Sequence, residues 1–206
     1  MAMSANDALE LDQLVEQLKK KPSSSSLGEE LMSFLRRTRA RRPDLVLRYG
    51  CPLLKKNLGA QLWDIHEQVF IAALDLHQLE LALTSLEAMQ KNFPGSLRVR
   101  RLEGKHLEAS GQYEDAMIVY DEILKEDPTH SAAWRSKVCV HRALGHSAEA
   151  IRELIEYLEV FASDADAWQE LADLYLGEQQ LEHAKFCYEE LILHTPQNYL
   201  FHSKYA

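Results

Sequence analysis

The sequence predicts an all-α solenoid, in which antiparallel helix pairs stack every 34 residues into a right-handed superhelix behind a helical N-terminal extension. The composition favours helix, because only 8 Gly and 6 Pro punctuate 206 residues that are rich in Leu, Ala and Glu. One residue type recurs on a fixed period, in Ala82, Ala116, Ala150 and Ala184, at intervals of 34. A second follows the same period twelve residues later, in Pro94, Pro128 and Pro196. A fixed period shared by several residue types indicates a repeat architecture.

Each repeat reads as two amphipathic helices joined by a tight turn. In the clearest unit, residues 97–109 form the first helix, residues 110–112 turn, and residues 113–126 form the second. Gly111 supplies the left-handed backbone that a helix end favours, and Pro128 cannot extend the second helix. We interpret the recurring alanine as the point where two helices cross too closely for a larger side chain.

The predicted units cover about residues 63–96, 97–130, 131–164 and 165–198, with a partial fifth at 199–206. The first unit keeps only Ala82 and Pro94 and is degenerate. In the third, Ala162 stands where the proline is expected, so its exit turn must be made differently. Because the fifth unit stops within a first helix, without the polar cap that a solenoid needs, we expect a fragment or a natural short form.

Residues 1–60 form the predicted extension. They carry 11 basic and 7 acidic side chains, a balance of +4, whereas residues 61–206 have a balance of −13. Helices are expected at about 8–20 and 28–39, separated by a flexible joint near residues 22–26. Asp44 is expected to cap a third helix that begins at Leu45, and Pro52 would kink that helix unless it starts later.

Composition excludes several classes of protein. A net charge of −9 and a pI near 5.5 disfavour binding to nucleic acid or anionic membranes through bulk charge. Three widely spaced cysteines form no C-x-x-C pair, so neither a disulfide framework nor a zinc ribbon is encoded. The sequence contains no secretory signal and no apolar run long enough to span a membrane. We therefore expect a protein of the cytosol or of a cytosol-facing surface.

The residues that could carry chemistry do not converge. No phosphate-binding glycine loop, nucleophile elbow or His-Glu-x-x-His motif is present. Cys139 and His141 are two residues apart and point in different directions from one helix. His66 and His77 share a helical face but lack an obvious third metal ligand. We expect no catalytic residue, metal, cofactor or small-molecule substrate.

The repeat residues resemble the tetratricopeptide (TPR) family over about residues 61–206. The resemblance rests on Gly104, Gly111, Tyr113, Ala116, Tyr120, Pro128, Trp134, Gly145, Ala150, Trp168, Leu171, Tyr175, Ala184, Tyr188 and Pro196. Longer strings, at residues 67–75, 93–96, 98–102, 150–154 and 167–175, resemble the TPR scaffold subunits of the endoplasmic-reticulum (ER) membrane protein complex. This resemblance implies a peripheral protein of the cytosolic ER face, whose partners are other subunits of that complex.

One set of basic residues is predicted to bind a partner. Arg98, Arg101 and Lys105 share a helical face, Arg135 is equivalent to Arg101 in the next repeat, and Arg142 extends the face of Arg135. By resemblance to TPR proteins, first helices line a concave groove, so these residues would give it a basic floor between acidic first and fourth units. The alternative is that these charges pair with one another across repeats.

A second basic set, the arginine run, comprises Arg36, Arg37, Arg39, Arg41 and Arg42. It could meet an acidic partner or lipid headgroups. We favour a solvated helix end, because no aromatic residues are interleaved with these arginines and no second basic run accompanies them.

The leading functional hypothesis is a non-catalytic scaffold that supports insertion of newly made transmembrane proteins by other subunits of the complex. The alternative is a freestanding TPR adaptor that binds a short peptide. An enzyme is a distant third.

Overall fold

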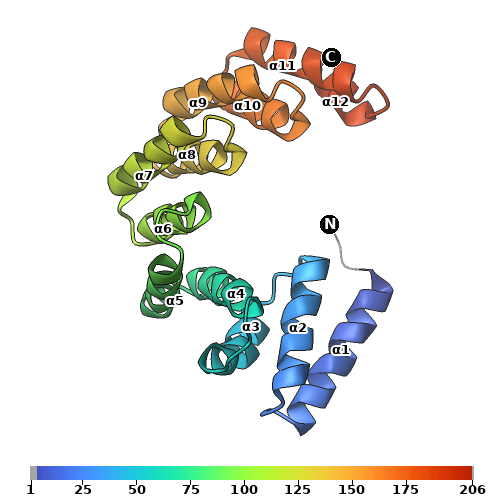
Figure 1. The fold of residues 1–206 in the computed structure, drawn as a ribbon. Helices are drawn as coiled ribbons and strands as arrows, with labels where there is room; N and C mark the ends of the chain where they lie inside the picture. The colour runs from blue at the N-terminus through green and yellow to red at the C-terminus, as the bar shows by residue number, and fades with distance from the viewer. Residues whose placement is uncertain (1–3, 206) are drawn as a thin grey trace. The chain divides into compact units, whose positions relative to one another are not determined.

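The computed structural model describes residues 4–205, and this part of the chain is helical with no strand (Figure 1). It divides into two compact units along the chain, unit 1 up to Gly111 and unit 2 from Gln112. The helices of unit 1 are α1 Ala5–Lys20, α2 Ser25–Thr38, α3 Pro43–Gly50, the 3₁₀ helix η1 Cys51–Lys55, α4 Gln61–Asp75, α5 Leu79–Asn92 and α6 Leu97–Ala109. Those of unit 2 are α7 Tyr113–Glu126, α8 Ser131–Ala143, α9 Ser147–Val160, α10 Ala165–Gly177, α11 Leu181–His194 and α12 Tyr199–Tyr205.

The predicted helix starts in the N-terminal extension need correction. Helix α2 begins at Ser25 rather than at residue 28, because the Ser24 hydroxyl accepts from the Leu27 backbone amide and caps it. Helix α3 begins with Pro43 in its first turn, where proline needs no amide partner. Asp44 is therefore not its cap but lies inside the first turn and pairs with Arg42.

Pro52 does not kink α3. The α-helix ends at Gly50, and Pro52 lies in the first turn of η1. The chain thus changes from an α-helix to a 3₁₀ turn just where a proline would have broken the α-helical hydrogen-bond ladder. Gly50 permits close packing at this point, since a Cβ there would lie 3.1 Å from Val69 Cγ2 and 3.3 Å from the Met32 sulfur.

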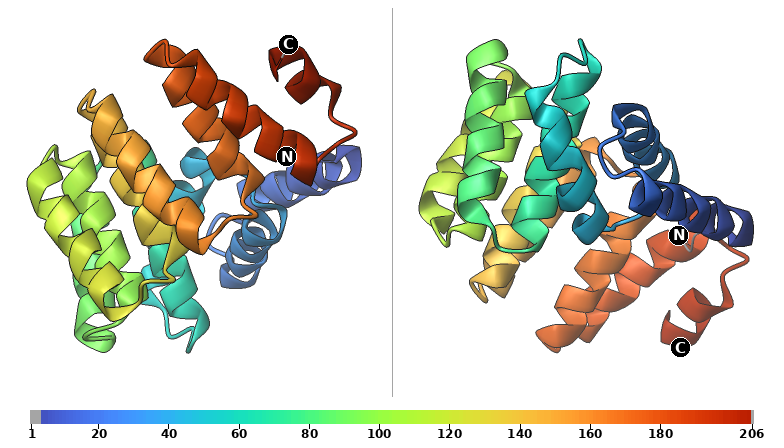
Figure 2. Two further views of the ribbon diagram at one scale, coloured as in Figure 1. Left: turned by 90° about the horizontal axis from the view of Figure 1, so that it is seen from above. Right: turned by 90° about the horizontal axis from the view of Figure 1, so that it is seen from below.

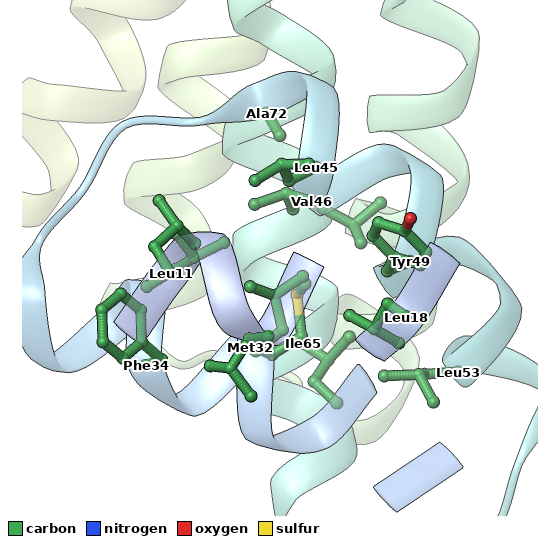
Figure 3. Packing of buried hydrophobic residues seen from close by; sticks show 14 residues of the cluster. Leu11, Leu18, Met32, Phe34, Leu45, Val46, Tyr49, Leu53, Ile65 and Ala72 are labelled. Carbon is green, nitrogen blue, oxygen red and sulfur yellow. The ribbon is translucent and has the colours of Figure 1, made fainter. Parts of the chain in front are cut away.

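Helices α1 to α4 and η1 share one hydrophobic core (Figure 3). Its buried members are Leu11, Leu14, Leu18, Leu31, Met32, Phe34, Leu35, Leu45, Val46, Tyr49, Leu53, Ile65, Val69 and Ala72. We call this set the N-terminal core. It contains side chains from both sides of the boundary predicted near residue 60, which stays a prediction.

The repeat helices follow the predicted period. Helices α6 and α7 have the predicted bounds of residues 97–109 and 113–126. Helices α4 with α5, α8 with α9 and α10 with α11 pack as pairs, and α12 lies against α11 (Figure 2). Ala82, Ala116, Ala150 and Ala184 are each at most 1% exposed, as the steric interpretation of the period requires. Ala206, the last residue of the predicted fifth unit, lies outside the described residues.

The turn inside each repeat has a left-handed backbone at the same position of the 34-residue period. Position 111 is Gly with φ 77°, and the equivalent Gly145 has φ 74°. One period before and after, His77 and Gln179 take positive φ values of 54° and 59° without being glycine. A left-handed conformation costs a residue with a Cβ about 1–2 kcal/mol. The period therefore determines the backbone shape even where glycine is missing.

The exit from the third repeat is made without proline but keeps the same contact. The indole Nε1 of Trp134 donates to the Pro128 carbonyl at 3.0 Å, and Trp168 Nε1 donates to the Ala162 carbonyl at 2.8 Å. What recurs is therefore a backbone carbonyl held by the ring six residues later, and alanine supplies it as well as proline does. Asp164 then caps α10 through the amides of Asp166 and Ala167.

Candidate functional site

The predicted partner-binding residues lie on two helices, one in each unit. In unit 1, α6 carries Arg98, Arg101 and Lys105. Arg98 forms an ion pair with Glu67 of α4, and Arg101 Nη2 lies 3.8 Å from Glu67 Oε1. The Glu67 side chain is only 15% exposed, so one half-buried carboxylate receives two guanidinium groups from the neighbouring repeat.

A hollow of about 330 Å³ opens beside these pairs, between α4, α5 and α6. Its lining is mostly apolar, with charged groups among the lining residues, which are Ala60, Trp63, Asp64, Glu67, Met89, Phe93, Ser96, Arg98, Val99 and Leu102. Trp63 forms an edge-on contact with Phe93, with ring centroids 5.2 Å apart, and its other ring contact is a stack on His66. Burial lowers the pKa of His66, which favours its neutral form.

In unit 2, α8 carries Arg135 and Arg142. Arg142 pairs with Glu170 of α10, and Arg135 Nη2 lies 4.0 Å from Asp164 Oδ2. Both arginines line a polar hollow of about 400 Å³, together with Asp166, Gln169, Glu170, Asp173 and Leu174. The first helices of unit 2 thus present charges of both signs rather than a purely basic floor.

Asp164, at the start of α10, is held by hydrogen bonds to both of its carboxylate oxygens. Its Oδ2 accepts from the Tyr157 hydroxyl at 2.6 Å, while its Oδ1 accepts from two backbone amides. Burial alone would raise the pKa of Asp164, but the Tyr157 hydroxyl, the amides and Arg135 together lower it. Burial and the same hydrogen bond raise the pKa of Tyr157 to about 12. Arg135 therefore faces a carboxylate that stays ionised.

The structure shows the cross-repeat pairing that was the alternative to partner binding. Four of the five predicted residues meet acidic side chains. In unit 1, Arg98 and Arg101 meet Glu67 of α4. In unit 2, Arg135 meets Asp164 at the start of α10, and Arg142 meets Glu170 within α10. Lys105 has no ion-pair partner among residues 4–205. Exposed ion pairs contribute only about 0–1 kcal/mol, so this pairing does not prevent exchange with a partner's carboxylate.

The arginine run is exposed to solvent, but four of its five members form ion pairs. Arg36 pairs with Asp64 of α4, Arg37 with Glu10 of α1, Arg41 with Asp75 of α4 and Arg42 with Asp44. Arg41 is bidentate, with its Nε and Nη2 at 2.9 and 2.6 Å from the two Asp75 oxygens. The run thus joins the end of α2 to α1 and α4, and the segment between α2 and α3 to α4. Sequence reasoning missed this because the partners lie up to 34 residues away.

A buried ion cluster in unit 2 was also missed. Lys137 of α8 is 8% exposed, and its Nζ lies 2.9 Å from Asp121 of α7 and 2.8 Å from Glu153 of α9. Burial alone would lower the pKa of Lys137, but the two carboxylates raise it, so the ammonium stays charged. His141 Nε2 lies 3.9 Å from the same Glu153. The only hint in the sequence is a lysine on the apolar side of an otherwise regular repeat.

No three His, Cys, Asp or Glu side chains within residues 4–205 gather in an arrangement that could hold a metal ion. No helix in the same range combines the length and the apolar content needed to cross a bilayer.

Comparison with known proteins identifies the repeat type. The EMC2 TPR-like repeat domain matches residues 83–206. Among curated proteins, ER membrane protein complex subunit 2 of Xenopus tropicalis is 45% identical over 81% of this chain and 57% of its own length. Subunit 2-B of Xenopus laevis is 48% identical over 72% of this chain and 50% of its length. The chain thus spans about half the length of these curated relatives.

Solved structures agree on the fold. A TPR protein from Parabacteroides merdae superposes with a TM-score of 0.70 at 13% identity, covering 97% of this chain and 77% of its own. A thermophilic TPR protein from Thermus thermophilus superposes with a TM-score of 0.62 at 19% identity, covering 88% and 97%. The fold is therefore the TPR solenoid fold. With the domain match over more than half of its length, the chain belongs to the EMC2 TPR-like repeat family.

Proposed function

We propose that this chain is a non-catalytic scaffold subunit of the ER membrane protein complex. It lies on the cytosolic side of the ER membrane as a peripheral protein, and it supports insertion of new transmembrane proteins by holding other subunits together. The observation that carries the proposal is 45% identity over 81% of the chain to a protein named as subunit 2 of that complex.

The TPR architecture suits this role physically. Stacked helix pairs bury a continuous core while leaving long surfaces of every helix pair available for contact. The hollows beside α6 and α8 both contain charged groups of both signs. Charge complementarity with a partner sets register and specificity more than raw affinity. We place partner-binding surfaces on Arg98, Arg101 and Lys105 in unit 1 and on Arg135 and Arg142 in unit 2.

The ion pairs on these two surfaces define how a partner would bind. A partner segment that carries carboxylates, or a free C-terminus, would exchange with Glu67 and Glu170 for the arginines. The arginines are already oriented by their internal partners, so little side-chain entropy is lost on exchange. Such surfaces bind acidic segments reversibly, and the binding becomes weaker as salt rises.

The test separates binding from internal pairing. Charge reversal of Arg98 or Arg101 is unsuitable, since a new carboxylate would face Glu67 and disturb the fold. We therefore compare the neutral variant Arg98→Gln with Arg142→Gln against the variant Glu67→Gln with Glu170→Gln, which releases Arg98 and Arg142 from their ion pairs. Lys91→Gln with Lys125→Gln, both on second helices, controls for the loss of two positive charges.

Each variant is expressed with an affinity tag, matched for helicity, and recovered from detergent-solubilised ER membranes. Wild type should co-elute with membrane subunits in fixed stoichiometry. The arginine variant should recover less, the glutamate variant at least as much as wild type, and the control the same. Equal recovery by all variants would contradict partner binding by these arginines but would leave the scaffold role standing. A wild-type chain that elutes alone would contradict the scaffold role and favour the freestanding adaptor.

A further inference from the structure

A second hollow lies in unit 2 on a different set of helices, and it differs in character from the polar one. It encloses about 360 Å³ between α9, α10 and α11, within the size range of ligand-binding pockets. It is lined by Ile155, Leu158, Glu159, Trp168, Leu171, Tyr175, His183, Phe186 and Cys187. Helix α10 packs against both α9 and α11, so the hollow lies within one stack of consecutive helices (Figure 2).

The hollow has a buried floor and an exposed apolar rim. Leu158, Leu171 and Cys187 are buried at its base, whereas Ile155 is 41% and Phe186 53% exposed. Trp168 meets Phe186 edge-on, with ring centroids 6.1 Å apart, and Tyr175 stacks on His183 at 5.0 Å. Aromatic walls fixed against one another form a site whose shape exists before anything binds.

One carboxylate lines this apolar hollow, and two others lie one helical turn from a lining residue. Glu159 is part of the lining, one turn after Ile155, and Glu182 and Glu190 lie one turn before and after Phe186 on α11. Burial, together with the nearby Glu190, raises the pKa of the Cys187 thiol to about 11. None of these three glutamates has an ion-pair partner among the residues that the structure describes. Three uncompensated negative charges around an apolar hollow specify a basic partner.

We propose that this hollow docks a basic amphipathic helix of a partner protein, with a large apolar side chain seated between Ile155 and Phe186 and lysines or arginines meeting Glu159, Glu182 and Glu190. The charge argument disfavours two other occupants. A second copy of this chain would bring the same acidic surface against itself, and an anionic membrane would be repelled. The inference concerns a different surface from the two arginine-lined ones and does not depend on membership of the ER complex.

The test uses a defined probe rather than an unknown ligand. A short fluorescein-labelled peptide of Leu and Lys, patterned as an amphipathic helix, is titrated with the full chain and followed by fluorescence anisotropy. The same peptide with Glu in place of Lys tests the charge requirement. Indole N–H resonances report the location, since Trp168 lines the hollow while Trp63 lies in unit 1.

Two variants separate the apolar and the charged contributions. Ile155→Ala with Phe186→Ala should weaken binding at least about tenfold, since it removes the apolar anchors. Glu159→Lys with Glu182→Lys should weaken it by about the same factor at low salt and less at high salt. Both pairs are exposed side chains, so helicity should not change. Glu80→Lys with Glu87→Lys on α5 is the charge-matched control and should bind like wild type.

The proposal is supported if the Lys peptide shifts the Trp168 indole resonance, if the Glu peptide does not bind, and if only the two hollow variants lose affinity. It is overturned if the control loses as much as Glu159→Lys with Glu182→Lys, because binding would then reflect net charge alone. It is also overturned if wild type dimerises in sedimentation equilibrium and Phe186→Ala abolishes the dimer. The occupant would then be a second copy.

Discussion

The N-terminal core and the core of unit 2 are both built from packed helices, but they differ in the size of the side chains between those helices. The N-terminal core fills the space between its helices with large aliphatic side chains and contains a single alanine, Ala72. The core of unit 2 contains four buried alanines, Ala150, Ala167, Ala172 and Ala184. Small residues at fixed intervals let helices approach closely in a regular stack, whereas irregular crossings need individually shaped large side chains.

The two regions also use charge differently. Around α1 to α4 the arginine run stays at the surface and reaches outward to carboxylates on other helices. In unit 2 a lysine is buried between two carboxylates from the helices before and after its own. Exposed pairs contribute little to stability, while removing one member of a buried pair is expensive. The comparison predicts that the repeats are the less tolerant of the two to substitution.

The largest effect is expected for Ala150→Arg. The new side chain has no room at a fully buried helix crossing and brings a charge without a partner. Overpacking and the buried charge together should destabilise unit 2 by more than about 3 kcal/mol. Thermal melting followed by circular dichroism measures the loss, with the exposed Leu193→Arg as the control. An unchanged melting midpoint would show that the repeat register is wrong.

The next effect is expected for Lys137→Ala, which leaves the half-buried Glu153 without its ammonium partner. We expect a loss of about 2–3 kcal/mol in urea unfolding, less than for a fully buried pair because Asp121 is partly exposed. Lys137→Met with Glu153→Leu should recover most of that loss, since the only carboxylate then left without its ammonium partner is Asp121, which is 47% exposed. Failure of the double variant to recover would mean that the pair itself, rather than the orphaned charge, stabilises unit 2.

A smaller change in the free energy of unfolding is expected at the repeat turns, where one substitution should stabilise the chain. Gln179→Gly should stabilise the chain by roughly 0.5–1 kcal/mol, because glycine relieves the left-handed strain at φ 59° but is more flexible when unfolded. Gly145→Ala should destabilise it by about 1–2 kcal/mol at the equivalent position. Denaturant midpoints of the two variants, measured against wild type, should therefore move in opposite directions.

The smallest effect is expected for Arg41→Ala in the arginine run. The Arg41 side chain is 79% exposed despite its bidentate contact with Asp75, so the loss should remain below about 1 kcal/mol. Arg39→Ala is not a suitable control, because Arg39 has a left-handed backbone. Lys20→Ala on α1 serves instead. A loss above about 2 kcal/mol would show that the arginines hold the N-terminal helices together rather than only orienting them.

Prediction from sequence succeeded where a local rule repeats. The bounds of α6 and α7, the buried alanines and the left-handed Gly111 follow from the 34-residue period and from the sterics of glycine and alanine. Prediction was weaker in the N-terminal extension, where no period reports the register. There the start of α2 depended on one serine hydroxyl, and the change to η1 on one proline.

The sequence by itself determined the repeat, its turns and the TPR family, because periodic patterns reflect contacts between residues that are close along the chain. Only the tertiary structure decided which charges are engaged: Arg98 with Glu67, Arg36 with Asp64, and Lys137 between Asp121 and Glu153. It also brought Ile155, Trp168 and Phe186 around one hollow. The physical reason is that charge pairing and concavity depend on distances between side chains from different helices. The packing of those helices, rather than any residue spacing, determines these distances.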